Sequence, residues 1–179
     1  MEKMRAREGE IWLRGGRKLV RLPGAALDYP RFGDGEREVV EVCTGRLTLD
    51  QFDAEVLAVV DDLCAFGYEK VHVTCGFGCN GDSLSQWREV PLPAAGLADY
   101  VAELERRGVY ELGETDLFVS AAGVEFRLCH EGDIHCAARA DCPLLCSVRR
   151  RWRRAYYHSW ERRHNGRWRR LAATRHGPA

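Results

Sequence analysis

Short stretches of alternating apolar and polar residues, joined by tight turns, constrain the fold of this chain most. The stretch at 116–130, DLFVSAAGVEFRLCH, has two such arms around an Ala-Gly pair and predicts an antiparallel hairpin. Residues 9–24, GEIWLRGGRKLVRLPG, repeat this pattern around a Gly-Gly pair. Glycine readily adopts the positive φ that short hairpin turns require. Because hairpins join antiparallel neighbours, the sheet is expected to be mainly antiparallel.

A third hairpin is predicted near the end of the chain. Residues 156–171 carry Asn165 and Gly166 between two arms rich in Trp and Arg. Asn-Gly is the strongest short signal for a hairpin, because both turn residues accept positive φ. The alternative is a helix that runs through to Arg163. Further strands are expected at 38–43 and 70–75, with a short one at 87–90.

Helical periodicity is clearest after the strand at 38–43. Thr48 and Gln51 have the spacing of a capping box, and Gly67 suits the position just after the last turn. The apolar residues between them recur at the spacing of one helical face. Two more helices are expected, one from Pro93 to about Gly108 and one capped by Asp141.

These elements predict an α+β fold, in which a mainly antiparallel sheet built from hairpins carries two to three helices on one face. The length of 179 residues and the apolar fraction of 45% suit one globular domain with a real core. No stretch approaches the ~18 apolar residues of a membrane span. The first residues also lack the apolar segment of a secretory signal, so a soluble cytoplasmic protein is expected.

Charge divides the chain into two parts. The formal net charge is zero, but residues 149–179 hold eleven Arg and one acid, Glu161, which leaves a net +10 there and −10 in residues 1–148. We therefore expect an acidic α+β body, 1–148, and a basic Arg/Trp-rich C-terminal segment, 149–179, packed on the same single domain. Such asymmetry indicates either contact with nucleic acid or neutralisation of the body by the basic end.

The basic segment mixes Arg with Trp and Tyr, which suits single-stranded nucleic acid or RNA. Arg pairs with phosphate and stacks on bases. The candidate nucleic-acid-binding residues are Arg150, Arg151, Trp152, Arg153, Arg154, Arg167, Trp168, Arg169 and Arg170. The favoured alternative is that Trp152 and Trp160 complete the core while the Arg residues face solvent or pair with the body, because an acidic body repels phosphate.

The nine residues at 128–136, LCHEGDIHC, hold two Cys, two His and two carboxylates. Interpreted as one strand with alternating faces, they place His130 on the core side and His135 on the opposite side. The two imidazoles then cannot share one ion. A bulge at Gly132 would bring them together, since glycine is where bulges occur.

Eight cysteines are many for a protein expected in the cytosol, where free thiols and metal ligands are usual. CGFGC and CPLLC are both C-x3-C pairs, and the second falls in an expected helix, where core packing explains it. The sharpest zinc hypothesis combines Cys75, Cys79, His130 and Cys136, because closed zinc sites need four convergent ligands. It requires strand 70–75 to adjoin strand 124–130.

The loop after strand 70–75 carries two partial motifs. GFGCNG at 76–81 has the spacing G-x-G-x-x-G, but too few residues follow it for the helix of a dinucleotide site. GDSLS at 81–85 resembles the nucleophile block of GDSL-type hydrolases, with Ser83 in the place of the nucleophile. A serine nucleophile needs a base and an orienting acid. That family also has a D-x-x-H block, whereas this sequence has only D-x-H, at 133–135. No motif of the sequence therefore establishes catalysis.

Two functions of different classes are therefore expected. The first is a small non-enzymatic interaction protein whose acidic body docks a basic protein partner, because complementary charge steers association. Small immunity- and antitoxin-type proteins offer an analogy of size and charge. The second is a nucleic-acid-binding module that uses residues 149–170, and a zinc-binding protein is a further alternative.

Overall fold

The computed structural model describes residues 10–12, 18–20, 39–76, 78–79, 88–163 and 169–171. The helical elements are α1 (Leu49–Ala65), η1 (Ala94–Gly96, one 3-10 turn), α2 (Leu97–Arg106) and α3 (Pro143–Arg154). The strands are β1 (Glu10–Trp12), β2 (Lys18–Val20), β3 (Val39–Thr44), β4 (Lys70–Cys75), β5 (Glu89–Pro93), β6 (Leu117–Ala121), β7 (Val124–Leu128), β8 (Ile134–Arg139), β9 (Ser159–Arg163) and β10 (Arg169–Arg170).

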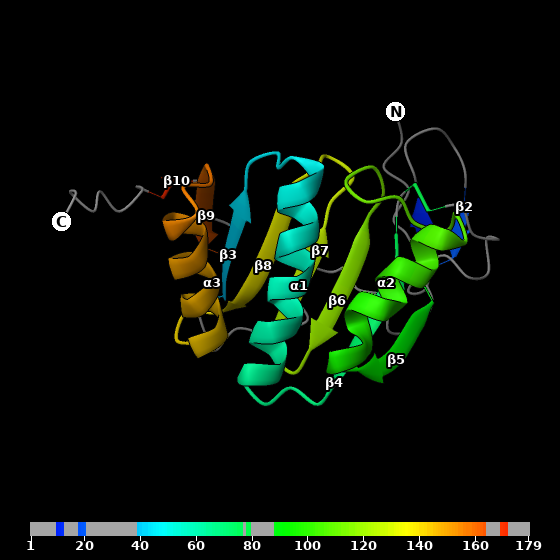
Figure 1. Ribbon diagram of the computed structural model, residues 1–179, viewed down its shortest axis with the longest axis horizontal. Coiled ribbons are helices and arrows are strands. Elements are labelled where there is room, and N and C mark those ends of the chain that lie inside the picture. Colours follow the sequence, from blue (N-terminus) through cyan, green and yellow to red (C-terminus); the bar gives the residue numbers. More distant parts are fainter. Residues whose placement is uncertain are drawn as a thin grey trace.

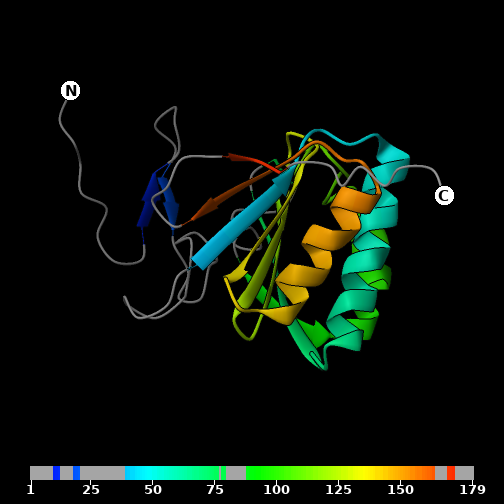
Figure 2. The ribbon, with the colours of Figure 1, turned by 90° about the vertical axis from the view of Figure 1, so that its left-hand side faces the viewer.

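Eight of these strands form one sheet in the order β10-β9-β3-β8-β7-β6-β4-β5. Every neighbouring pair in it is antiparallel. Strands β1 and β2 pair with each other as a separate antiparallel ribbon. All three α-helices lie against one face of the large sheet, with α1 between α3 and α2 (Figures 1 and 2). The predicted α+β fold is confirmed.

The core lies between this sheet and the three helices. Each strand turns alternate residues toward the helices, as the two-residue period of a strand requires. Val42, Phe126 and Ile134 lie on this side with no solvent exposure. The helices contribute their own apolar stripes, of which Trp152 of α3 is the largest fully buried side chain. The prediction that Trp152 and Trp160 complete the core is therefore confirmed for Trp152 and wrong for Trp160, which is half-buried and pairs with Cys43 on the other face of the sheet.

The start of α1 has the capping box that the sequence predicts. The backbone N–H of Gln51 donates to Thr48 Oγ1 at 3.3 Å, and the backbone N–H of Thr48 donates to Gln51 Oε1 at 3.0 Å. Gly67 follows the helix with a φ of +79°, where a residue with a side chain is strained.

Replacing Thr48 with Ala should lower the free energy of unfolding by about 1 kcal/mol, because one N–H of the first turn loses its acceptor. Chemical denaturation measures this loss. The control is Thr48→Ser, which keeps the hydroxyl and should unfold close to the unaltered protein. Equal losses in the two variants would contradict the capping role.

One prediction at the start of α3 is wrong, and the structure decides between the two alternatives left open after its end. Asp141 does not cap this helix: Cys142 occupies the N-cap and makes no side-chain cap hydrogen bond. Asp141 instead accepts a hydrogen bond from Nε of Arg139 at 3.0 Å. The helix ends at Arg154, so it does not continue to Arg163. The predicted hairpin follows it as β9 and β10, although its turn at 164–168 lies outside the described residues.

The interpretation of LCHEGDIHC as one strand is wrong. Strand β7 ends at Leu128 and β8 begins at Ile134, and the two pair antiparallel. Residues 129–133 form the turn of a hairpin, in which Gly132 has a φ of +76°. The sequence analysis predicts no separate strand at 134–139, because it interprets residues 128–136 as one continuous strand. The glycine marks a reversal of the chain and not a bulge.

Candidate functional site

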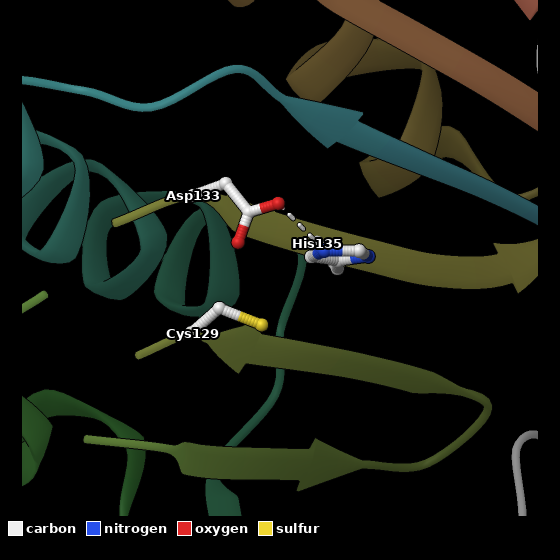
Figure 3. A group of neighbouring side chains, drawn as sticks. All are labelled: Cys129, Asp133 and His135. Carbon is white, nitrogen blue, oxygen red and sulfur yellow. Dashed lines mark hydrogen bonds and ion pairs between the residues drawn. The ribbon is translucent and has the colours of Figure 1, made fainter. Parts of the chain in front are cut away.

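The β7–β8 turn gathers three chemically active side chains on the face of the sheet away from the helices. Cys129 leaves β7, Asp133 enters β8, and His135 lies within β8 (Figure 3). Each offers one ligand atom, and these atoms all lie within 4.8 Å of one another. Cys129 and His135 are buried, and Asp133 is half-buried. Burial raises the pKa of the Cys129 thiol, so this sulfur is protonated at neutral pH when no metal is bound.

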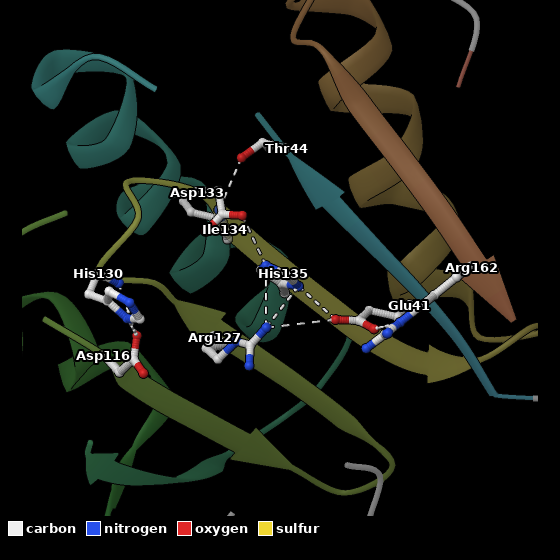
Figure 4. A network of polar contacts seen from close by, with 9 residues as sticks. All are labelled: Glu41, Thr44, Asp116, Arg127, His130, Asp133, Ile134, His135 and Arg162. Carbon is white, nitrogen blue, oxygen red and sulfur yellow. Dashed lines mark hydrogen bonds and ion pairs between the residues drawn. The ribbon is translucent and has the colours of Figure 1, made fainter. Parts of the chain in front are cut away.

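His135 lies between two carboxylates. Its Nδ1 is 2.6 Å from Oε1 of Glu41, and its Nε2 is 3.1 Å from Oδ2 of Asp133 (Figure 4). The register of β3 on β8 explains the first contact: Cys43 faces His135, so Glu41 is the diagonal neighbour on the same side of the sheet. His135 is only 7% exposed and Glu41 only 3%, which makes this a buried ion pair when His135 is protonated.

The pKa values of both partners follow from competing effects. Burial acts to lower the pKa of His135, but the hydrogen bonds to Asp133 and Glu41 outweigh it and raise this pKa above its usual value. Burial acts to raise the pKa of Glu41, but His135 and Arg162 outweigh it and lower this pKa. The arrangement therefore favours the charged forms of His135 and Glu41.

Two arginines complete the cluster. Nε of Arg162 on β9 donates to Oε2 of Glu41. Nη2 of Arg127 on β7 lies 4.0 Å from Oε1 of Glu41, and it is 3.2 and 3.4 Å from the two ring nitrogens of His135. If Nη2 lay in the plane of the imidazole ring, these near-equal distances to the two nitrogens would press it against the ring carbon between them. Arg127 therefore lies over the face of the imidazole.

The sequence analysis singled out the stretch that holds Cys129, Asp133 and His135, but it missed their partners Glu41, Arg127 and Arg162. The helix-free face carries Glu41, Arg127, Cys129, Asp133, His135 and Arg162 as one network. A signal was present: Glu41 interrupts the apolar run VVEVC, and His135 interrupts IHCAA. A charged residue buried in a strand normally has a partner across the sheet.

The predicted zinc ligands are only partly brought together. Cys75 and Cys79 are neighbours, and a hydrogen bond between them lowers the pKa of Cys79. The Cys79 thiol also donates to the backbone oxygen of Asp116 at 3.4 Å. Nδ1 of His130 lies 2.8 Å from Oδ1 of the same Asp116. Three of the four predicted ligands thus lie around Asp116, which the prediction did not include.

The fourth predicted ligand, Cys136, lies apart from the others. Strand β6 separates β4 from β7, so β4 does not adjoin the strand at 124–128 as the hypothesis requires. Cys75 on β4 and Cys136 on β8 are three strand positions apart, about 14 Å at the usual strand spacing. Cys136 is fully buried under the helices. Cys75, Cys79, His130 and Cys136 therefore do not form one group.

The candidate nucleic-acid-binding residues divide into three kinds. Trp152 is fully buried, and its Nε1 donates to Oε2 of Glu55 at 2.8 Å. Arg151 pairs with Glu55 and Asp62 of α1. Arg150, Arg154, Arg169 and Arg170 are exposed, and Arg153 is half-buried. Arg167 and Trp168 lie outside the described residues.

Part of the basic segment is used inside the fold. Arg149 pairs with Glu161, as Arg151 does with Glu55, and Arg162 with Glu41. Helix α3 contains both residue 148 and residue 149, so the boundary between the acidic and the basic part of the sequence falls inside one helix. Arg151 and Arg162 thus neutralise buried acids of the described body, whereas Glu161, the partner of Arg149, belongs to the basic segment itself.

The exposed face of α1 carries acids without such partners. Asp50, Asp53 and Asp61 are exposed, and no ion pair joins them to another residue in the described part of the chain. Leu57 lies among them with 52% of its surface exposed. Leu49, at the start of the helix, is 66% exposed.

The partial motifs of the cysteine loop fall mostly outside the described residues. Residues 77 and 80–87 are not described, so the match at 76–81, Ser83 and the GDSLS block remain untested. Among the helices that are described, none is both long and apolar enough to cross a membrane.

The chain was also compared with known proteins. No family model matches it, and neither a curated protein nor a solved structure was found to be similar to it. The functional argument therefore depends on the charges, contacts and burial of its own residues.

Proposed function

We propose that this protein is a non-enzymatic interaction protein that binds a basic protein surface through the exposed face of α1. The observation that carries the proposal is the row of Asp50, Asp53 and Asp61 around the exposed Leu57. At 3.6 residues per turn, these four positions fall within an arc of about 80° on the helix. They therefore face one partner at the same time.

The chemistry of this row suits a partner that is basic at its rim and apolar at its centre. Single exposed leucines are common on protein surfaces and alone indicate no site. Three carboxylates around an apolar side chain add a local negative potential, which speeds encounter with a positive surface and selects against acidic ones.

The contrast within α1 supports this proposal. Glu55 and Asp62 point toward α3, where Arg151 binds both. Arg151 thus meets the inward acids of α1, while the outward acids remain available to another molecule. Figure 1 shows α1 in the middle of the helical layer, where a partner contacts it from outside the sheet.

A nucleic-acid partner has less support. Among the candidate residues that the structure describes, Trp152 is buried in the core, and Arg150, Arg154, Arg169 and Arg170 are exposed. Burial of Trp152 removes one stacking platform, worth about 1–3 kcal/mol per base, and leaves Tyr156, 65% exposed, as an aromatic side chain for stacking in this part of the segment.

Charge reversal on α1 tests the two functions against each other. The probes are a fluorescent Lys/Arg-rich amphipathic peptide and a single-stranded oligonucleotide, followed by anisotropy. In Asp50→Lys/Asp53→Lys/Asp61→Lys, affinity for the peptide should fall at least about tenfold, since each exposed pair contributes about 0.2–1 kcal/mol. The peptide should also shift the backbone NMR signals of α1.

The matched control reverses three exposed acids elsewhere, Asp99, Glu105 and Glu111. It makes the same change in net charge and should alter affinity by less than about twofold. Equal losses of peptide affinity in the two triple variants would mean that net charge alone controls binding, which would contradict a site on α1. Tighter binding of the oligonucleotide, lost on Arg150→Glu/Arg154→Glu, would favour the nucleic-acid function.

A further inference from the structure

We propose that Cys129, Asp133 and His135 bind one zinc ion on the helix-free face of the sheet. This site is separate from the exposed face of α1 and does not depend on the interaction proposed above. It uses none of Cys75, Cys79 and Cys136, and it replaces His130 with His135.

The donor set fits zinc better than the common hard cations. Thiolate, imidazole and carboxylate are all usual zinc ligands, whereas calcium and magnesium select oxygen. Zinc bonds of about 2.0–2.3 Å place tetrahedral ligands about 3.3–3.8 Å apart. The three ligand atoms lie within 4.8 Å of one another, so side-chain shifts of about 1 Å complete the geometry (Figure 3).

Glu41 supplies an independent indication of a metal site. Histidine ligands commonly donate their second ring N–H to a carboxylate, which fixes the ring and its tautomer. Oε1 of Glu41 lies 2.6 Å from Nδ1 of His135 and is well placed to accept this hydrogen bond. That leaves Nε2 as the ligand atom, on the side of Asp133. Arg162 holds the other oxygen of Glu41 (Figure 4).

Asp133 supplies a second indication. Its Oδ1 is buried and has no N–H or O–H donor among the described residues, and besides His135 the carboxylate has only the weakly donating Cys129 thiol. A bound cation would satisfy Oδ1. Asp133 also lines a hollow of about 420 Å³ together with Cys43, Thr44 and Trp160. Of the three proposed ligands only Asp133 lines this hollow, so an ion that enters it from solvent meets Asp133 first.

The charges of the cluster balance when zinc binds. The ion takes the place of two protons, one on the Cys129 sulfur and one on Nε2 of His135, which leave to solvent. One dipositive ion replaces two single positive charges, so the net charge around the arginines is unchanged. Arg127 lies over the ring face, which leaves the in-plane lone pair of Nε2 accessible. The positive charge of Arg127 repels the ion, and the negative charge of the thiolate formed at Cys129 offsets this repulsion.

Cobalt and zinc binding test the site on the full chain after treatment with a chelator. One Co²⁺ per chain should give a sulfur-to-cobalt charge-transfer band, and Zn²⁺ should displace it. Cys129→Ser should abolish the band and weaken zinc binding by more than about 100-fold. Loss of a residue that only hydrogen-bonds to a ligand is expected to weaken binding by about 10–100-fold. Glu41→Gln should weaken zinc binding within that 10–100-fold range and keep the band.

Cys43→Ser is the matched control, because Cys43 is another buried thiol on this face and pairs across the strands with His135. It should keep both the band and the affinity. Circular dichroism of each metal-free variant separates loss of ligand from loss of fold. Binding of no metal by the unaltered protein, a spectrum without the sulfur band, or loss of the band in Cys43→Ser with retention in Cys129→Ser would overturn the proposal.

Discussion

Replacing Glu55 with alanine should lower the free energy of unfolding by about 3 kcal/mol, the lower part of the range for breaking a buried ion pair. Glu55 is 3% exposed, and its Oε2 accepts from Nη2 of Arg151 at 2.9 Å and from Nε1 of Trp152 at 2.8 Å. Alanine leaves the indole N–H buried without an acceptor and removes one partner of the guanidinium. Asp62 still binds Arg151, which limits the loss.

Urea unfolding followed by circular dichroism measures this change. The control is Asp53→Ala on the exposed side of the same helix, which should shift the free energy of unfolding by no more than about 0.5 kcal/mol. Glu55→Gln separates two contributions, because it keeps an oxygen for Trp152 and loses the charge that Arg151 requires. A loss in Glu55→Ala no larger than in Asp53→Ala would show that α3 docks on α1 by apolar packing alone.

Local signals predict most of the elements because their causes lie close together in the sequence. The capping box of Thr48 and Gln51 and the Ala-Gly turn between β6 and β7 are each set by neighbouring residues. The predicted antiparallel sheet follows from those turns. Helix capping at Asp141 failed because α3 begins one residue later, with Cys142 at the N-cap, and the Asp141 carboxylate binds Arg139 instead.

The functional cluster depends on long-range register and could not be predicted in the same way. Glu41 and His135 are 94 residues apart and meet because β3 pairs with β8. Predicting that contact requires recognising β8 as a strand of its own. In the sequence, Gly132 indicates a bulge and a hairpin turn equally well. The structure shows the turn, and only the turn brings Cys129 back over His135.

The charge asymmetry had two interpretations, and the described residues favour one of them. Arg149, Arg151 and Arg162 each pair with an acid of the fold. The basic segment thus serves the packing of α3 and β9, and it is not wholly available to an external phosphate. Among the acids that remain exposed, Asp50, Asp53 and Asp61 lie together on one face of α1 around Leu57, which is why binding of a basic partner is the better supported function.

The second large effect concerns Glu41. In metal-free protein, Glu41→Ala should lower the free energy of unfolding by about 3 kcal/mol between about pH 4.5 and 6.5, because it leaves protonated His135 buried without one of its two carboxylates. It also removes the partner of Arg162, whose side chain is 38% exposed, whereas Asp133 still binds His135 and limits the loss. Glu41 has a lowered pKa, so its contribution is present above its ordinary value of 4.5 and is lost as the pH falls through the lowered value. His135 has a raised pKa, so its contribution is present below 6.5 and is lost as the pH rises through the raised value.

A double-mutant cycle with Glu41→Gln and His135→Gln, measured by urea unfolding with chelator present, isolates the interaction between the two side chains. The coupling should be largest between about pH 4.5 and 6.5 and should fall as the pH rises through the raised pKa of His135, since the imidazole then loses its charge. Asp133 and Arg127 also act on His135, in opposite directions, and both are unchanged through the cycle. A coupling that stays constant from acid to alkaline pH would mean that Glu41 binds a neutral imidazole. The hydrogen bond would then remain, but the ion pair would not contribute to stability.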